Sequence, residues 1–100
     1  MKVAIQFVNI PTSESLETYT QGKLENLEKK YEDIINVTVF FKRENSPKKL
    51  GRICEMELSL AGPRIFASSN EKNYELAVKH TISDLEKQLK KRKGVLKPYM

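Results

Sequence analysis

The chain has 100 residues and carries 18 lysines and arginines against 13 aspartates and glutamates, a formal net charge of +5 with a pI near 9.4. This length supports one domain with one hydrophobic core, and the basic balance favours a polyanionic partner such as nucleic acid. The single cysteine, Cys54, excludes a disulfide framework and a multi-cysteine zinc site, and no apolar run approaches the roughly 18 residues of a membrane span. Residues 1–10 are too short for a signal peptide, so we expect a cytoplasmic protein.

Charge is concentrated in separate segments of the chain. Residues 13–33 hold six acids against three lysines, a net charge of −3. Residues 42–52 hold five bases against one acid, and residues 71–97 hold eight bases against four acids, so each of these segments has a net charge of +4. A chain that needed charge only for solubility could interleave its signs. The separation therefore favours a binding surface made by the two basic segments.

The first part of the chain predicts a strand, a helix and a second strand. Apolar and polar residues alternate over 2–8 and again over 35–42, as in strands with one buried face. Between them, Ser13 is suited to cap a helix over about 13–32, because its hydroxyl can accept from a free backbone N–H of the first turn. The residues expected to face the core are Val3, Ile5, Phe7, Leu16, Thr20, Leu24, Leu27, Tyr31, Ile35, Val37, Val39 and Phe41.

Two further strands are predicted after a polar loop. Residues 43–51 contain proline and glycine between charged residues, which is typical of a hairpin connection. Alternation then predicts strands over 52–60 and 64–68, joined by the tight turn 61–63. Their expected inward residues are Cys54, Met56, Leu58, Leu60, Ile65 and Ala67.

The last predicted element is a helix with two different faces. We expect Ser69 or Asn70 to cap it, Glu71 to lie in its first turn, and Gly94 to stop it after about Arg92. At 100° per residue, one stripe is apolar: Val78, Ile82, Leu85 and Leu89. The opposite side is mainly cationic: Lys79, His80, Ser83, Lys87, Lys90 and Lys91. Such a face is either a binding surface or a solvated lysine-rich helix end that complements the helix dipole.

These elements predict an α+β fold with the order β-α-β-β-β-α. Because the strands alternate, both helices should cover one face of a four-stranded mixed sheet and leave the other face solvated. The arrangement is similar to that of double-stranded RNA-binding domains. We expect a single domain over residues 1–94, followed by a short flexible tail over 95–100.

The sequence offers little for catalysis. His80 is surrounded by lysines on an exposed helix face, and Cys54 is expected to be an inert thiol in the core. The acids Glu25, Glu28 and Glu32 fall on a convex exposed face, without the cleft that acid–base chemistry needs. There is no P-loop and no dinucleotide fingerprint. We therefore predict a protein that is not an enzyme and has no metal, cofactor or small-molecule substrate.

The chemistry that remains is binding. Lysines contact phosphates as point charges and read no base, which suits recognition of structured RNA by shape and phosphate positions. Two alternatives remain open. One is a general structured-RNA-binding module. The other is a protein-interaction regulator that uses Glu25, Glu28 and Glu32 of the first helix against a basic partner.

Two stretches carry a family resemblance. In residues 13–39, a Ser/Thr cap, a leucine, an aromatic residue and a basic–apolar pair precede a Leu-Glu-x-x-Tyr motif. In residues 74–96, a start with tyrosine and alanine leads to Leu-Glu-Lys-Gln-Leu and a basic end. Together they resemble the ribosome hibernation-promoting factors, also called ribosome-associated inhibitors, and residues 65–68 fit as well. The matching positions are Ser13, Leu16, Tyr19, Lys23, Leu24, Leu27, Glu28, Tyr31, Ala77, Leu85, Glu86, Lys87, Gln88, Leu89 and 90–93.

The resemblance implies the same fold and a bacterial translation inhibitor of stationary or starved cells. Such a protein binds the small ribosomal subunit at the mRNA/tRNA channel, where it contacts rRNA and neighbouring ribosomal proteins and stabilises idle ribosomes. The resemblance also implies a short family member, which we expect to be monomeric off the ribosome and to have no membrane partner.

The resemblance and the cationic face together give the candidate RNA contacts. They are Lys23, Lys79, His80, Lys87, Lys90, Lys91, Arg92 and Lys93, with secondary contacts at Lys42, Arg43, Lys48, Lys49 and Arg52. Two positions depart from the family pattern. Asp84 stands where a lysine is usual, and Lys79 stands where an aspartate is frequent, so the cationic face is expected to be slightly rotated.

Overall fold

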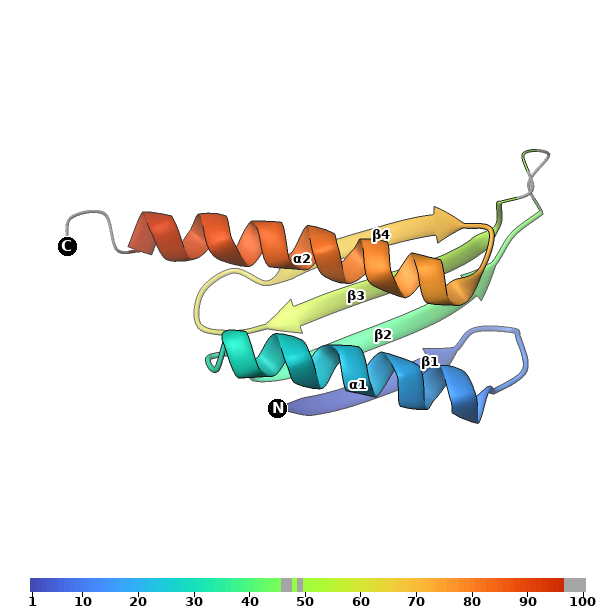
Figure 1. The fold of residues 1–100 in the computed structure, drawn as a ribbon, viewed down its shortest axis with the longest axis horizontal. Coiled ribbons are helices and arrows are strands. Elements are labelled where there is room, and N and C mark those ends of the chain that lie inside the picture. The colour runs from blue at the N-terminus through green and yellow to red at the C-terminus, as the bar shows by residue number, and fades with distance from the viewer. Residues whose placement is uncertain (46–47, 49, 97–100) are drawn as a thin grey trace.

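The computed structural model describes residues 1–45, 48 and 50–96, with side chains up to Arg92 in the last helix. The described residues form four strands and two helices in the predicted order β-α-β-β-β-α (Figure 1). The elements are β1 (Lys2–Phe7), α1 (Glu14–Lys30), β2 (Asn36–Arg43), β3 (Arg52–Ser59), β4 (Ile65–Glu71) and α2 (Tyr74–Leu96).

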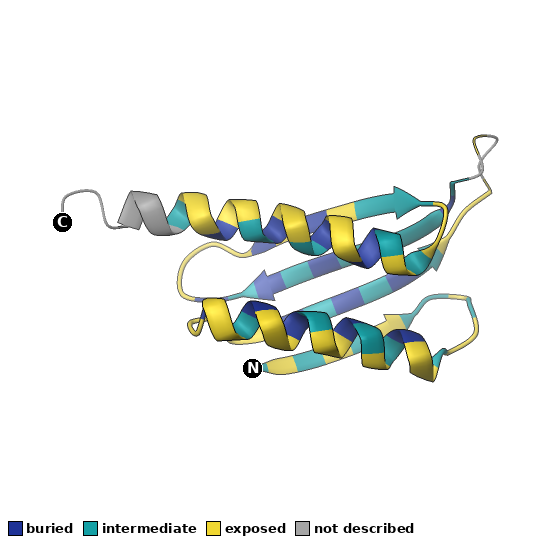
Figure 2. Cartoon of the chain, viewed as in Figure 1, coloured by how far each residue is buried: buried dark blue, intermediate teal, exposed yellow. Residues whose placement is uncertain are grey.

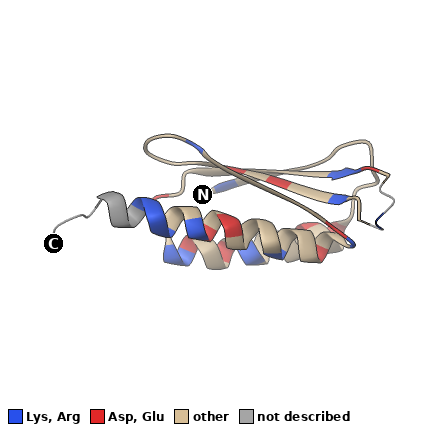
Figure 3. Ribbon diagram, turned by 90° about the horizontal axis from the view of Figure 1, so that it is seen from above, with Lys and Arg blue, Asp and Glu red and all other residues tan. Residues whose placement is uncertain are grey.

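The strands form one mixed sheet in the order β1-β2-β3-β4. β1 pairs with β2 in parallel, whereas β2 with β3 and β3 with β4 are antiparallel. A parallel pair needs a crossover connection, which α1 supplies. Both helices lie on the same face of the sheet, as Figure 3 shows from the side. The predicted α+β architecture is confirmed.

The core lies between the helices and the covered face of the sheet (Figure 2). Val37, Val39, Phe41, Cys54, Met56 and Leu58 are at most 1% exposed, and the leucines that α1 was predicted to bury are indeed buried. Full burial of one such apolar side chain stabilises the fold by about 1.5–3 kcal/mol. Two threonines lie among them, and each satisfies its hydroxyl locally. Thr20 donates to the Leu16 carbonyl at 2.7 Å, and Thr81 donates to the Ala77 carbonyl at 2.8 Å.

One predicted core residue is exposed. Ile35 was expected to begin the inward row of the second strand, but its side chain is 55% exposed, while its neighbour Ile34 is 3% exposed. β2 starts one residue later, at Asn36. The Ile34 N–H donates to the Tyr31 carbonyl at 3.4 Å, so Ile34 belongs to the turn after α1 and fills the core there.

The start of the last helix also differs from the prediction. Ser13 caps α1 as expected, with its Oγ accepting from the Leu16 N–H at 3.2 Å. The expected cap of α2 at Ser69 or Asn70, with Glu71 in the first turn, is wrong. Residues 69–71 pair with residues 52–54 of β3 and remain in β4. The cap is instead Asn73, whose Oδ1 accepts from the Leu76 N–H at 2.8 Å.

The end of that helix is further along than predicted. α2 continues through Gly94 to Leu96, so the expected stop at Gly94 is wrong, and residues 95–96 belong to the helix instead of a tail. A glycine inside a helix costs about 1 kcal/mol relative to alanine and does not by itself end the helix. The other expected tail residues, 97–100, lie outside the described residues.

Candidate nucleic-acid interface

The predicted lysine row is on the exposed side of α2. Packing fixes the helix orientation, because Ala77, Val78, Thr81 and Leu85 are each fully buried. The residues about half a turn away must then face solvent, and all of them are exposed: Lys79, His80, Ser83, Lys87, Lys90 and Lys91. We call these residues the cationic face of α2. Helical residues rise about 1.5 Å each, so the face is about 18 Å long.

The lysines of this face are available to a partner. Within the described part of the chain, none of Lys79, Lys87, Lys90 and Lys91 forms an ion pair. Lys87, Lys90 and Lys91 lie within about one helical turn, so their ammonium groups can reach neighbouring phosphates. Basic residues gather toward the C-terminal end of α2 in Figure 3.

His80 is held at the border between the cationic face and the sheet. Its Nδ1 lies 2.8 Å from Oε2 of Glu71 in β4, and a carboxylate is an acceptor, so Nδ1 carries the proton in this contact. The His80 side chain is 51% exposed. The hollow beside it is lined by residues of both charges, Glu71, Asp84 and Lys87 among them. The contact with Glu71 therefore fixes the His80 ring at the edge of the cationic face.

Lys23 lies on the side of α1 that faces α2. Lys30 comes two helical turns after Lys23 and pairs with Glu86 of α2 at 3.2 Å, which fixes the direction of that side. The Lys23 ammonium lies 5.5 Å from the ring centre of Tyr19. Lys23 therefore lies on the side of α1 nearest α2, so an RNA segment bound to α2 could also contact it.

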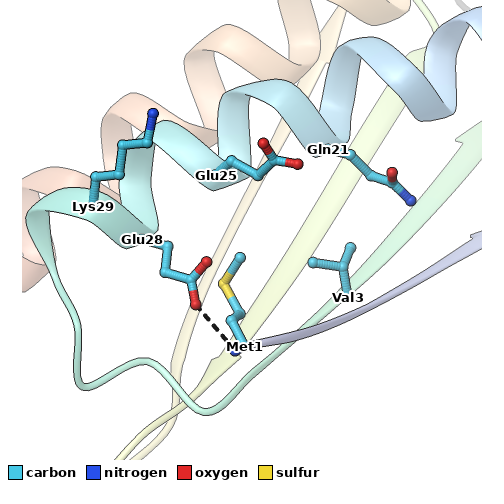
Figure 4. Close-up of a pocket in the computed structure, with 6 residues that line it drawn as sticks. All are labelled: Met1, Val3, Gln21, Glu25, Glu28 and Lys29. Atoms are coloured by element: carbon cyan, nitrogen blue, oxygen red, sulfur yellow. Dashed lines mark ion pairs between the residues drawn. The ribbon is translucent and has the colours of Figure 1, made fainter.

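The acids of α1 point elsewhere. Figure 4 shows an open hollow between α1 and β1, lined by Met1, Val3, Gln21, Glu25, Glu28 and Lys29. The amino group of Met1 pairs with Oε2 of Glu28 at 3.0 Å. The two helices thus present charges of opposite sign on opposite sides of the helix layer.

The predicted secondary contacts lie at the end of the molecule where α2 begins (Figure 1). The end of β2 and the start of β3 lie at one end of the 48 Å long axis, and the C-terminal end of α2 lies toward the other (Figure 1). Arg43 and Arg52 are direct cross-strand partners, whereas Lys42 pairs with Glu55 at 2.9 Å. Lys48 has an interaction partner, and Lys49 lies outside the described residues. The hairpin arginines are therefore far from Lys90 and Lys91, but they lie near the Lys79–His80 end of the cationic face, because Glu71 contacts His80 and is the cross-strand partner of Arg52.

Tyr74 connects the hairpin end to the start of α2. Its hydroxyl donates to the Lys42 carbonyl at 2.9 Å. Burial raises the pKa of this hydroxyl, and the nearby Arg52 and Arg43 guanidinium groups oppose the rise. Both arginines therefore lie close to the first turn of α2, at the base of the hairpin.

Arg92 and Lys93 are not placed like the other candidates. Nη2 of Arg92 donates to the Pro63 carbonyl at 2.5 Å, in the turn between β3 and β4. Arg92 follows Leu85 by seven residues, so helical spacing puts it on the packing side, a signal that was already present in the sequence. The backbone of Lys93 is helical, and its side chain is outside the described residues.

The described residues offer no other reactive group, because the thiol is buried and the possible metal ligands do not form a cluster. Burial raises the pKa of the Cys54 thiol to about 12, so it remains a protonated core group at neutral pH. Among the described residues, no three His, Cys, Asp or Glu side chains gather as a metal site would require. No helix in that part of the chain combines the length and apolar character needed to cross a membrane.

Comparison with known proteins assigns the family. A model described as sigma 54 modulation protein / S30EA ribosomal protein matches residues 3–97. The chain belongs to this family. Membership confirms the resemblance to ribosome hibernation factors, and it makes the chain a member of a ribosome-associated family that is not a family of enzymes. No curated protein matches the sequence.

Two solved structures have the S30EA-family fold seen here. A ribosomal subunit interface protein from Coxiella burnetii has a TM-score of 0.81 and 23% identity, with 94% of this chain and 99% of that one covered. The N-terminal domain of Protein Y from Thermus thermophilus has a TM-score of 0.77 and 19% identity, with 91% and 98% covered. At these identities the likeness establishes the fold, and the contacts of this chain must be argued from its own residues.

Proposed function

We propose that this protein is a translation inhibitor that binds the small ribosomal subunit at the mRNA/tRNA channel and stabilises idle ribosomes in the cytoplasm. The observation that carries the proposal is the cationic face of α2, an exposed row that includes four lysines without ion pairs among the described residues. The family supports a ribosomal partner for this face. A protein seated in the channel would exclude mRNA and tRNA by occupying their space.

The chemistry of the face suits rRNA. Lysine ammonium groups are point charges that contact phosphates without reading bases, so the position of the protein depends on RNA shape. The proposed contacts are Lys79, His80, Lys87, Lys90 and Lys91, with Lys23 at the border and Lys93 following in the helix. We propose the hairpin residues Lys42, Arg43, Lys48, Lys49 and Arg52 as a second set, directed to a different RNA segment or a neighbouring ribosomal protein.

Co-sedimentation with purified ribosomal subunits across a salt series tests this function. Each neutralised phosphate contributes roughly −0.7 to −0.9 to the slope of log K against log salt. The variant Lys87→Glu/Lys91→Glu should remain folded, because both side chains are exposed, and should lose binding to the small subunit. The matched control is Lys2→Glu/Lys29→Glu, which reverses two exposed charges away from the cationic face and should bind normally.

Other outcomes would favour other functions. Intact binding by Lys87→Glu/Lys91→Glu would contradict the proposal. Equal affinity for a free RNA duplex and for the ribosome would favour a general structured-RNA-binding module, because the element arrangement is similar to that of double-stranded RNA-binding domains. Binding that survives loss of the α2 lysines but fails in Glu25→Gln/Glu28→Gln/Glu32→Gln would favour a basic protein partner at the hollow of Figure 4.

A further inference from the structure

Two polar side chains of α2 reach back to the sheet on the side away from the lysines. Nε2 of Gln88 donates to the Phe66 carbonyl of β4 at 3.0 Å, and Nη2 of Arg92 donates to the Pro63 carbonyl of the β3–β4 turn at 2.5 Å. Gln88 and Arg92 are four residues apart, so they lie one above the other on the helix. Together they attach the second half of α2 to the beginning of β4 and the turn before it.

The surroundings of Arg92 argue against an RNA contact. A bidentate contact with a phosphate needs two guanidinium N–H groups free on one edge. Here Nη2 is used by the Pro63 carbonyl, and Nη1 is enclosed, without a hydrogen-bond partner in the described part of the chain. A bidentate phosphate contact through the Nη1 and Nη2 edge would therefore require the contact with the turn to open.

The contact lies where α2 leaves the sheet. In Figure 1 the helix runs past the β3–β4 turn, and its C-terminal part extends beyond the end of the sheet. The turn is therefore the last part of the sheet beside which the helix passes, and the Arg92 bond holds the base of the projecting part. Lys87, Lys90 and Lys91 lie within five residues of Arg92, so the same bond fixes the direction in which they point.

We infer that Arg92 and Gln88 are positioning residues, which fix the basic end of α2 against the β3–β4 turn and do not themselves contact RNA. The use of this fixed end for RNA rests on the proposed function, whereas the contact itself does not. Fixing the helix before binding lowers the entropy lost when its lysines engage phosphates, because the lysine-bearing backbone is already ordered.

Hydrogen exchange of the free protein tests the contact without the ribosome. The informative variant is Arg92→Met, and the matched control is Lys91→Met, which removes the same charge one residue earlier on the cationic face. Loss of the Arg92 bond should raise amide exchange by about five-fold or more at Ile65, the first residue of β4 that pairs with β3, whereas Lys91→Met should leave it unchanged. Gln88→Met should raise exchange at Ala67, which pairs with Met56 of β3 beside the Phe66 carbonyl. Unchanged exchange in both Arg92→Met and Gln88→Met would overturn the inference.

Salt-dependent binding to the small subunit separates positioning from phosphate contact. Lys91→Met should lower the magnitude of the log–log slope by about 0.7–0.9, the contribution of one phosphate. Arg92→Met should weaken binding a few-fold at every salt concentration and leave the slope unchanged. An equal loss of slope in both variants would show that Arg92 contacts RNA. If the wild-type protein does not bind the subunit, the proposed function fails, and the exchange experiment still decides the contact.

Discussion

At the scale of single residues, Gly51 closes the β2–β3 hairpin in a conformation that other residues avoid. Its φ is +122°, its carbonyl accepts from the Glu44 N–H at 3.0 Å, and its own N–H donates to Oδ1 of Asn70 at 2.6 Å. A Cβ added here would lie 2.2 Å from the Glu44 carbonyl oxygen. The backbone of Glu44 would have to move, and the hairpin hydrogen bond would be disturbed.

Gly51→Ala should therefore lower the free energy of unfolding by about 1–3 kcal/mol, the usual range for backbone strain. Gly22→Ala is the matched control. Gly22 lies in α1, and a Cβ there meets nothing within 4 Å, so this change should stabilise the protein by about 0.5–1 kcal/mol. Urea unfolding of the two variants measures both effects. Equal effects of the two substitutions would contradict the strain at Gly51.

The buried thiol of Cys54 should make the folded protein less stable in alkaline solution. Burial raises the thiol pKa from 9.0 to about 12, so the folded state favours the protonated form. This contribution is complete below pH 9 and is lost as the pH rises above the unfolded pKa, by about 3 kcal/mol at pH 11. Other groups titrate in this range, so the measurement is the difference in pH dependence between wild type and Cys54→Ala. If the free energy of unfolding changed with pH in the same way in both proteins, the thiol pKa would not be raised in the folded state.

At the scale of elements, the faces of strands and helices could be predicted, but their ends could not. Alternation identifies inward residues such as Val39 and Met56, because strand geometry repeats every two residues. The end of β4 depends on pairing with β3, a contact between residues about 19 apart, which no local signal at Ser69 reveals. The exchange of Ile34 for Ile35 in the core has the same origin, since the end of α1 determines which of the two is covered.

In the candidate site too, local positions could be predicted from the sequence, but contacts with distant segments could not. The exposed lysines of α2 could be predicted because they lie opposite an apolar stripe on one helix. The partner of Arg92 could not, because the Pro63 carbonyl belongs to a turn 29 residues earlier in the chain. Helical spacing does place Arg92 on the packing side, but the composition of residues 90–93 suggests one uniform basic cluster.

The observed cap of α2 can be tested against the expected one. Asn73→Ala removes the acceptor for the Leu76 N–H and should lower the free energy of unfolding by about 1 kcal/mol, within the usual range of 0.5–2 kcal/mol for N-caps. Ser69→Ala changes one of the two residues expected to cap the helix but leaves the observed cap intact, so its effect should be smaller. Thermal unfolding monitored by circular dichroism compares them. A larger loss in Ser69→Ala would place the cap at the start predicted from the sequence.

At the scale of the whole molecule, the positive charge extends from the hairpin arginines beside the start of α2 to the C-terminal end of that helix. The acids of α1 lie on the β1 side, where Glu28 pairs with the amino group of Met1, while the cationic face of α2 lies away from it. The hairpin arginines are at the opposite end of the long axis from Lys90 and Lys91 (Figure 1). A phosphate strand that lies only along the C-terminal half of α2 would contact only its lysines, whereas a channel with RNA on several sides would contact both ends of the molecule.

Salt-dependent binding of two double variants distinguishes these arrangements. Lys90→Gln/Lys91→Gln and Arg43→Gln/Arg52→Gln each remove two positive charges, one pair at each end. If both ends contact rRNA, each variant should lower the magnitude of the log–log slope by about 1.4–1.8. The quadruple variant should lose the sum, because sites this far apart are independent. Removing Arg43 and Arg52 also relieves the repulsion of like charges directly opposite in a strand pair, so the hairpin variant should remain folded. If Arg43→Gln/Arg52→Gln kept the wild-type slope, the hairpin arginines would not contact rRNA. The interface would then be confined to the α2 end of the protein.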